Sequence, residues 1–129
     1  MTVRSLLITS SFTCLALPAY AQDMNFNRIS SFQVADNLPE AEETSAEIIA
    51  ATADGMTLVY TDSPGASIGF IDITGPKNPA PLGVFMPEGE PPSVAVIGNY
   101  ALAGVNTSAS DTEPSGFLVV TCCPKGPSL

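Results

Sequence analysis

The sequence predicts an all-β protein made of consecutive four-stranded antiparallel meanders, about one and three-quarter blades of an incomplete β-propeller. The chain has 129 residues, which is the length of a single domain. It contains 10 Gly and 12 Pro, a composition that favours turns over long helices. Short runs of β-forming residues also recur along it at a nearly constant spacing, which is typical of a repeat architecture.

Residues 1–21 have the pattern of a bacterial secretory signal peptide. Arg4 supplies the positive charge, an apolar run extends from Leu6 to Leu17, and Ala19-Tyr20-Ala21 is a small-x-small cleavage site. A transmembrane anchor is the alternative, but the apolar run is shorter than the ~20 residues that a bilayer span needs. We therefore expect cleavage after Ala21 and a periplasmic or extracellular mature protein with no membrane attachment.

An acidic, irregular lead-in is expected over residues 22–45. Residues 29–34 partly alternate between apolar and polar side chains, which allows one short strand there. The cluster of Glu40, Glu42 and Glu43 is typical of a solvated linker. No functional role is assigned to this segment.

Residues 46–90 are expected to form the first blade. Runs of β-forming residues predict four strands, over 47–51, 57–61, 68–73 and 82–86. Asp54-Gly55 separates the first two runs and indicates a hairpin, because both residues tolerate positive φ. Pro76 and Pro79 place a loop between the last two, since proline cannot donate to a β-ladder.

Residues 91–121 repeat this order as a partial second blade, with strands predicted over 93–97, 100–105 and 116–120. Ile49 matches Val94 after 94 − 49 = 45 residues, and Leu58 matches Leu102 after 102 − 58 = 44. The Gly-Phe pair at Gly69 returns at Gly116, after 116 − 69 = 47. A β-sandwich with chance alternation is the alternative, but the matched order of strand, turn and Gly-Phe strand favours propeller blades.

The second unit ends without a fourth strand. Residues 122–129 contain Pro124 and Pro127, show no alternation, and are predicted to be an irregular tail, aberrant for a blade. A propeller closes with at least ~4 blades, so this segment alone would leave apolar faces and strand edges open. We expect the N-terminal part of a longer propeller, truncated or shifted in frame near Val120. Its partners would be the missing blades, or other copies of itself through exposed strand edges.

The composition excludes several kinds of function. With 4 Lys and Arg against 13 Asp and Glu, the formal net charge is -9, so no nucleic-acid partner is expected. Because the chain has no His, it can form no Ser-His or Cys-His catalytic pair and no His-ligated zinc site. No catalytic residue and no organic-cofactor site is assigned.

The cysteines give little further information. Cys14 would leave with the signal peptide, so that only the adjacent pair Cys122 and Cys123 remains. Such a pair can form a strained vicinal disulfide or offer two thiolates to a soft metal, but no suitable third ligand stands nearby. The simplest interpretation is that the pair has no specific role.

A family resemblance is carried by residues 45–64, 68–73, 76–83, 90–96 and 105–108. These segments resemble the opening of a bacterial secreted propeller family, variously named for choice-of-anchor domains, LVIVD-type repeats or the esterase-like domain of phytases. Its members are often labelled alkaline phosphatase-like. The resemblance therefore implies a cation-dependent phosphoester hydrolase, with Ca²⁺ as the expected cofactor of a full-length relative.

Four residues are candidates for a cation site on one rim of the propeller. Glu47 and Glu90 are expected to precede the first strand of each unit, and Asp62 and Asn106 to end the second strand. Their oxygen atoms suit Ca²⁺ or Mg²⁺, which could hold and polarise a phosphate ester. Turn capping is the alternative, because Asp and Asn commonly bond backbone N–H groups in loops. A non-catalytic binding module and an inactive remnant are the alternative functions.

Overall fold

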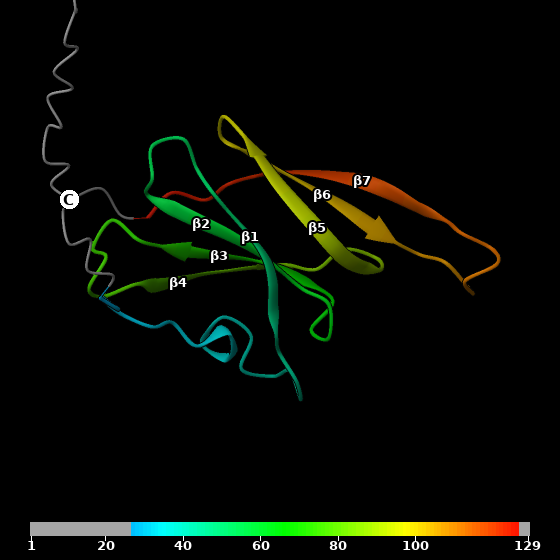
Figure 1. Ribbon diagram of the computed structural model, residues 1–129, viewed down its shortest axis with the longest axis horizontal. Coiled ribbons are helices and arrows are strands. Elements are labelled where there is room, and N and C mark those ends of the chain that lie inside the picture. The colour runs from blue at the N-terminus through cyan, green and yellow to red at the C-terminus, as the bar shows by residue number, and fades with distance from the viewer. Residues whose placement is uncertain (1–26, 127–129) are drawn as a thin grey trace, which may run out of the picture.

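The computed structural model describes residues 27–126 and contains two antiparallel sheets (Figure 1). The first has the order β1-β2-β3-β4, with β1 (Ala46–Ala51), β2 (Thr57–Asp62), β3 (Ser67–Asp72) and β4 (Ala80–Phe85). The second has the order β5-β6-β7, with β5 (Glu90–Ile97), β6 (Tyr100–Asn106) and β7 (Gly116–Cys122). A 3-10 turn, η1 (Val34–Asp36), precedes them. The all-β prediction is confirmed.

The predicted signal peptide lies outside the described residues. Within residues 27–126, no helix has the length and apolarity needed to cross a membrane.

Glycines close the first hairpin of each sheet. Gly55, between β1 and β2, has φ 69, and Gly98, between β5 and β6, has φ 61. Only glycine adopts this left-handed region without a steric cost to a Cβ atom. The turn predicted at Asp54-Gly55 is therefore confirmed, and Gly98 closes the corresponding turn of the second sheet. The two hairpins start meanders of four and three antiparallel strands.

Two strands begin two or more residues earlier than the sequence predicts. β4 starts at Ala80 rather than residue 82, and β5 starts at Glu90 rather than residue 93, so that prolines lie inside both strands. Each is an edge strand of its sheet, where a missing N–H can face away from the neighbouring strand. An irregularity in the register between Glu90 and Ser93 absorbs the two prolines of β5.

The hydrogen bonds of the middle strands show which residues of the two sheets are equivalent. Thr57 O accepts from Thr52 N, so odd-numbered residues of β2 bond to β1. Asn99 O accepts from Cys123 N, so odd-numbered residues at β6 bond to β7, and even-numbered ones bond to β5. Bonding direction and side-chain face are coupled by chirality. An odd residue of β2 is therefore equivalent to an even residue of β6.

This match corrects two of the three repeat steps. Ile49, Tyr60 and Gly69 lie side by side across the first sheet, and Val94, Ala103 and Val119 do so across the second. The step of 45 in the first strand agrees with the bonding pattern, whereas the other steps are 103 − 60 = 43 and 119 − 69 = 50. The predicted steps of 44 and 47 are wrong because the connecting loops of the two sheets differ in length. Each differs from the structural step by an odd number of residues, which would place the matched side chains on opposite faces of their sheets.

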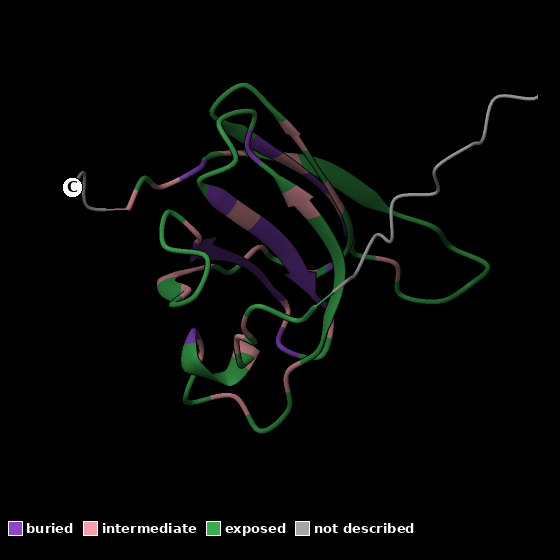
Figure 2. Cartoon of the chain, turned by 60° about the vertical axis from the view of Figure 1, so that its left-hand side comes forward, coloured by how far each residue is buried: buried purple, intermediate pink, exposed green. Residues whose placement is uncertain are grey.

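The main core lies between the two sheets. Val59, Ile68 and Phe70 of the first sheet cluster with Ala101 and Ala103 of the second. Partly buried side chains complete this cluster from both sheets: Leu82, Val94, Val96 and Val119. As a result, the buried segments concentrate in the first sheet and on β6 (Figure 2). Removal of this apolar surface from water holds the two sheets together.

The lead-in covers the other face of the first sheet. Asn37 is buried, and its Nδ2 donates to Tyr60 Oη at 3.0 Å and to the Phe70 carbonyl at 2.8 Å. Its Oδ1 accepts from Gly83 N at 3.0 Å, so the amide bridges β3 and β4 where their register is irregular. The lead-in is therefore not simply a solvated linker. The strand allowed over 29–34 does not form, and the segment is irregular up to η1.

Tyr60 fits this face because Gly69 opposite it has no side chain. A Cβ atom at Gly69 would overlap the Tyr60 ring at Cζ and Oη. Burial raises the pKa of the Tyr60 phenol, which keeps the hydroxyl neutral next to Asn37. Tyr60, Gly69 and Asn37 thus form one packed unit that joins the lead-in to the sheet.

Candidate functional site

The structure places the four predicted cation ligands at one end of each sheet, but not as four loop residues. Asp62 and Asn106 are the last residues of β2 and β6. Glu90 is the first residue of β5, directly opposite Asn106. Glu47 lies inside β1 and does not precede it, because β1 begins at Ala46. The expectation that both glutamates precede their strands is therefore wrong.

Asp62 caps the turn between β2 and β3. The carboxylate is fully buried, and its Oδ1 accepts from Gly65 N and from Ser45 N, both at 2.9 Å. The Asp62 Oδ2 atom has no hydrogen-bond partner, and the hydroxyl of Ser67, the residue opposite it, has none either. Charge-assisted bonds to two backbone N–H groups account for the position of this carboxylate.

The remaining candidates also form local hydrogen bonds. Ser63 Oγ donates to Glu47 Oε2 at 2.7 Å, and Ser108 N donates to Asn106 Oδ1 at 3.0 Å. The turn-capping alternative therefore describes both Asp62 and Asn106. In residues 27–126, no group of three or more His, Cys, Asp or Glu side chains has the arrangement of a metal site. The Ca²⁺ or Mg²⁺ rim stays a prediction.

The acidic cluster of the lead-in borders a depression of about 530 Å³ beside the Asp62 turn. Glu40, Glu42 and Glu43 line one side, and Pro64 and Gly65 of the turn line the other. The sequence reveals the cluster but not its neighbour, because the turn and the lead-in meet only in the folded chain.

The two adjacent cysteines point to different surroundings. Cys122 is exposed at the end of β7, and Cys123 is buried in the core between the sheets, both as free thiols. Burial raises the pKa of the Cys123 thiol, which disfavours the reactive thiolate. The two thiols therefore differ in accessibility, and Cys122 is the one open to solvent.

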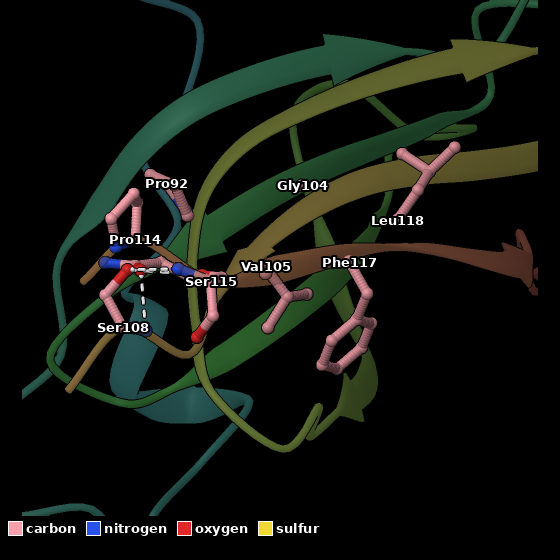
Figure 3. Close-up of a pocket in the computed structure, with 10 residues that line it drawn as sticks. Pro92, Gly104, Val105, Ser108, Pro114, Ser115, Phe117 and Leu118 are labelled. Carbon is pink, nitrogen blue, oxygen red and sulfur yellow. Dashed lines mark hydrogen bonds between the residues drawn. The ribbon is translucent and has the colours of Figure 1, made fainter.

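A second depression, of about 610 Å³, lies at the β6–β7 hairpin (Figure 3). It is lined by ten residues without a charged side chain: Pro92, Gly104, Val105, Asn106, Ser108, Pro114, Ser115, Gly116, Phe117 and Leu118. Ser108 Oγ accepts from Ser115 N at 2.9 Å and donates to the Ser115 carbonyl at 3.2 Å. This hydroxyl therefore holds the loop closed, and no neighbouring base activates it.

The most prominent surface feature is apolar. On the second sheet, the face turned away from the core carries Ile97, Tyr100, Leu118 and Val120, with exposed fractions of 65%, 52%, 63% and 58%. The register places these residues on one face, because Ile97 lies opposite Tyr100 and Val120 lies opposite Leu102, two residues from Tyr100. We call these four residues the outer patch. The sequence signal for it is the continuous apolar run from Phe117 to Val120, which places apolar side chains on both faces of β7.

Comparisons of the chain with protein-family models, with curated protein sequences and with solved structures find no match.

Proposed function

We propose that the chain is a non-catalytic binding module, the opening part of a secreted β-propeller, whose outer patch receives a further β-sheet. One observation carries this proposal. The outer patch is an apolar sheet face that nothing in residues 27–126 covers, and soluble monomers rarely leave such a face open.

The equivalence of the two sheets supports the propeller architecture. Phe70 of β3, which packs against the second sheet, is equivalent to Val120 of the outer patch, since 120 − 70 = 50. The face that the first sheet presents to the second is therefore the face that the second presents outward. Rotation about a propeller axis relates blades in this way, and it would place the next blade on the outer patch.

The hydrolase that the family resemblance implies is the second candidate. Its specific support is the fully buried Asp62 Oδ2, which lacks a hydrogen-bond partner close to the acidic lead-in. A cation could compensate this oxygen. A phosphatase assay of a full-length relative, with and without chelator, tests this candidate: activity abolished by the chelator would favour it, and absence of activity favours the binding module.

The binding module has its own test. We expect Ile97→Lys with Leu118→Lys to reduce the fluorescence of a bound apolar dye severalfold. Both side chains are exposed, so the free energy of unfolding should stay within about 0.5 kcal/mol of the original. Thr112→Lys, in the exposed β6–β7 loop, is the control. Equal dye binding by all three proteins would contradict the docking role of the outer patch.

The propeller part of the proposal is tested on the coding DNA. Translation of the region downstream of the Val120 codon in all three frames should reveal further blade-like repeats. If no frame contained such repeats, the propeller part of the proposal would be wrong, and the chain would be a two-sheet module or an inactive remnant.

A further inference from the structure

The free edge of β7 is the other unsatisfied surface of the second sheet. β7 pairs with β6 from Gly116 to Cys122 without a break in register, and no strand in the described part of the chain pairs with its other edge. Natural edge strands are usually protected by charges, prolines or bulges. The seven residues of β7 contain no charged residue and no proline. This combination of β-forming residues and low charge favours pairing with another strand.

The direction of the free backbone groups follows from two hydrogen bonds. Ser115 O accepts from Thr107 N, and Cys123 N donates to Asn99 O, so odd-numbered residues of β7 bond to β6. The N–H and C=O groups of the alternate residues therefore point away from the sheet: Gly116, Leu118, Val120 and Cys122. β3 offers the equivalent groups to β4, but β7 has no such neighbour among residues 27–126.

We propose that a second copy of this chain pairs with this edge, β7 against β7 in antiparallel orientation, about a two-fold axis at Val119. In this register Leu118 lies opposite Val120 of the second copy, and Gly116 lies opposite Cys122. All outward backbone groups of both strands are then matched, in about eight hydrogen bonds. This pairing goes beyond the proposed function, because it involves the edge of β7 and not the outer patch on its face.

Charge and side-chain chemistry fit a second copy. The chain has a net charge of -9, and the uncharged β7 is a stretch where two copies approach without like charges in contact. Antiparallel pairing also brings the end of β7 that follows Glu113 beside the end that precedes Lys125 of the second copy. The two-fold axis joins the two outer patches on one side of a continuous sheet, with Leu118 and Val120 as apolar cross-strand neighbours.

The oligomeric state of the full chain tests this pairing. We expect the mass in solution to rise toward twice the chain mass as the protein concentration increases. Leu118→Pro removes an outward N–H without removing a bond to β6, so it should abolish the dimer. Leu118→Thr keeps that N–H and should dimerise. A monomer at all concentrations, or equal dimerisation of both variants, overturns the proposal, and the dye experiment on the outer patch still decides the binding module separately.

Crosslinking tests the register without relying on proline. In a chain carrying Cys14→Ser and Cys122→Ser, Val119→Cys would meet itself at the axis in a closely spaced pair. We expect mild oxidation to convert most of this variant to a disulfide-linked dimer. Val120→Cys in the same background faces residue 118 of the second copy and should crosslink at least tenfold less. No dimer from Val119→Cys, or more from Val120→Cys, overturns the proposed pairing.

Discussion

The two sheets share a topology but differ in how much of each is covered. All six residues of β3 are buried, whereas five of the seven residues of β7 are exposed. In the first sheet, the lead-in covers one face and the second sheet covers the other, while β4 pairs with the outer edge of β3. The second has a neighbouring sheet on one face alone. The same antiparallel strand order therefore forms a core in one sheet and a surface in the other, depending on what packs against it.

The largest expected difference is at one pair of equivalent positions. Phe70→Ala should lower the free energy of unfolding by about 4 kcal/mol, because Phe70 is 4% exposed and fills the core between the sheets. Val120→Ala, its counterpart in β7, should change it by about 0.5 kcal/mol or less. Urea unfolding measures both. Similar costs would show that β7 is covered in solution.

Gly69 and Val119 form a second equivalent pair. Gly69→Ala should cost about 3 kcal/mol, because the added Cβ overlaps the Tyr60 ring. Gly75→Ala, in the loop after β3, is the matched control, since the nearest atom to its Cβ is the Asn78 carbonyl oxygen at 4.0 Å. Thermal unfolding compares them. If Gly69→Ala were as stable as Gly75→Ala, the ring would not lie over β3.

Asn37 distinguishes the covered face of the first sheet. Asn37→Ala should cost about 2 kcal/mol, because it leaves the Phe70 carbonyl and Gly83 N without their partner. Asn99→Ala is the control, since that side chain is exposed at the turn between β5 and β6. Amide hydrogen exchange should also speed up at Gly83 in the first variant alone. Unchanged exchange there would mean that the lead-in does not dock through Asn37.

The smallest expected effect is a dependence on acid. Hydrogen bonds from the backbone N–H and the hydroxyl of Thr74 hold the pKa of Asp72 below its ordinary value of 3.8. A lowered pKa stabilises the fold above the unfolded-state value, and this contribution is lost as the pH falls through the folded-state value. Asp72→Asn should therefore flatten the decline in thermal stability below about pH 4. An unaltered decline would contradict this assignment. The equivalent residue of β7 is Cys122, which carries no carboxylate.

Much of the fold could be predicted from local sequence. Alternating β-forming runs and Gly turns such as Gly55 and Gly98 predict the strands and their order, because both depend on neighbouring residues. The repeat steps could not be predicted accurately, because loop lengths shift the register without altering the pattern within a strand. The lead-in was also beyond prediction, since Asn37 reaches residues 23 and 33 positions away.

The candidate site shows the same division. The residue types at Asp62 and Asn106 were compatible with both cation binding and turn capping, and only the folded turn shows their backbone N–H partners. The continuous apolar run of β7 puts apolar side chains on both of its faces, but which face is exposed depends on what packs against it.

The amino-acid sequence by itself determined the all-β class, the two meanders and the acidic character, because these depend on composition and on periodicity within short segments. The tertiary structure alone decided which sheet is covered, where Asn37 docks, and which edge and face of the second sheet stay open. Burial is a relation between segments far apart in the chain, and local preference contains no information about that distance.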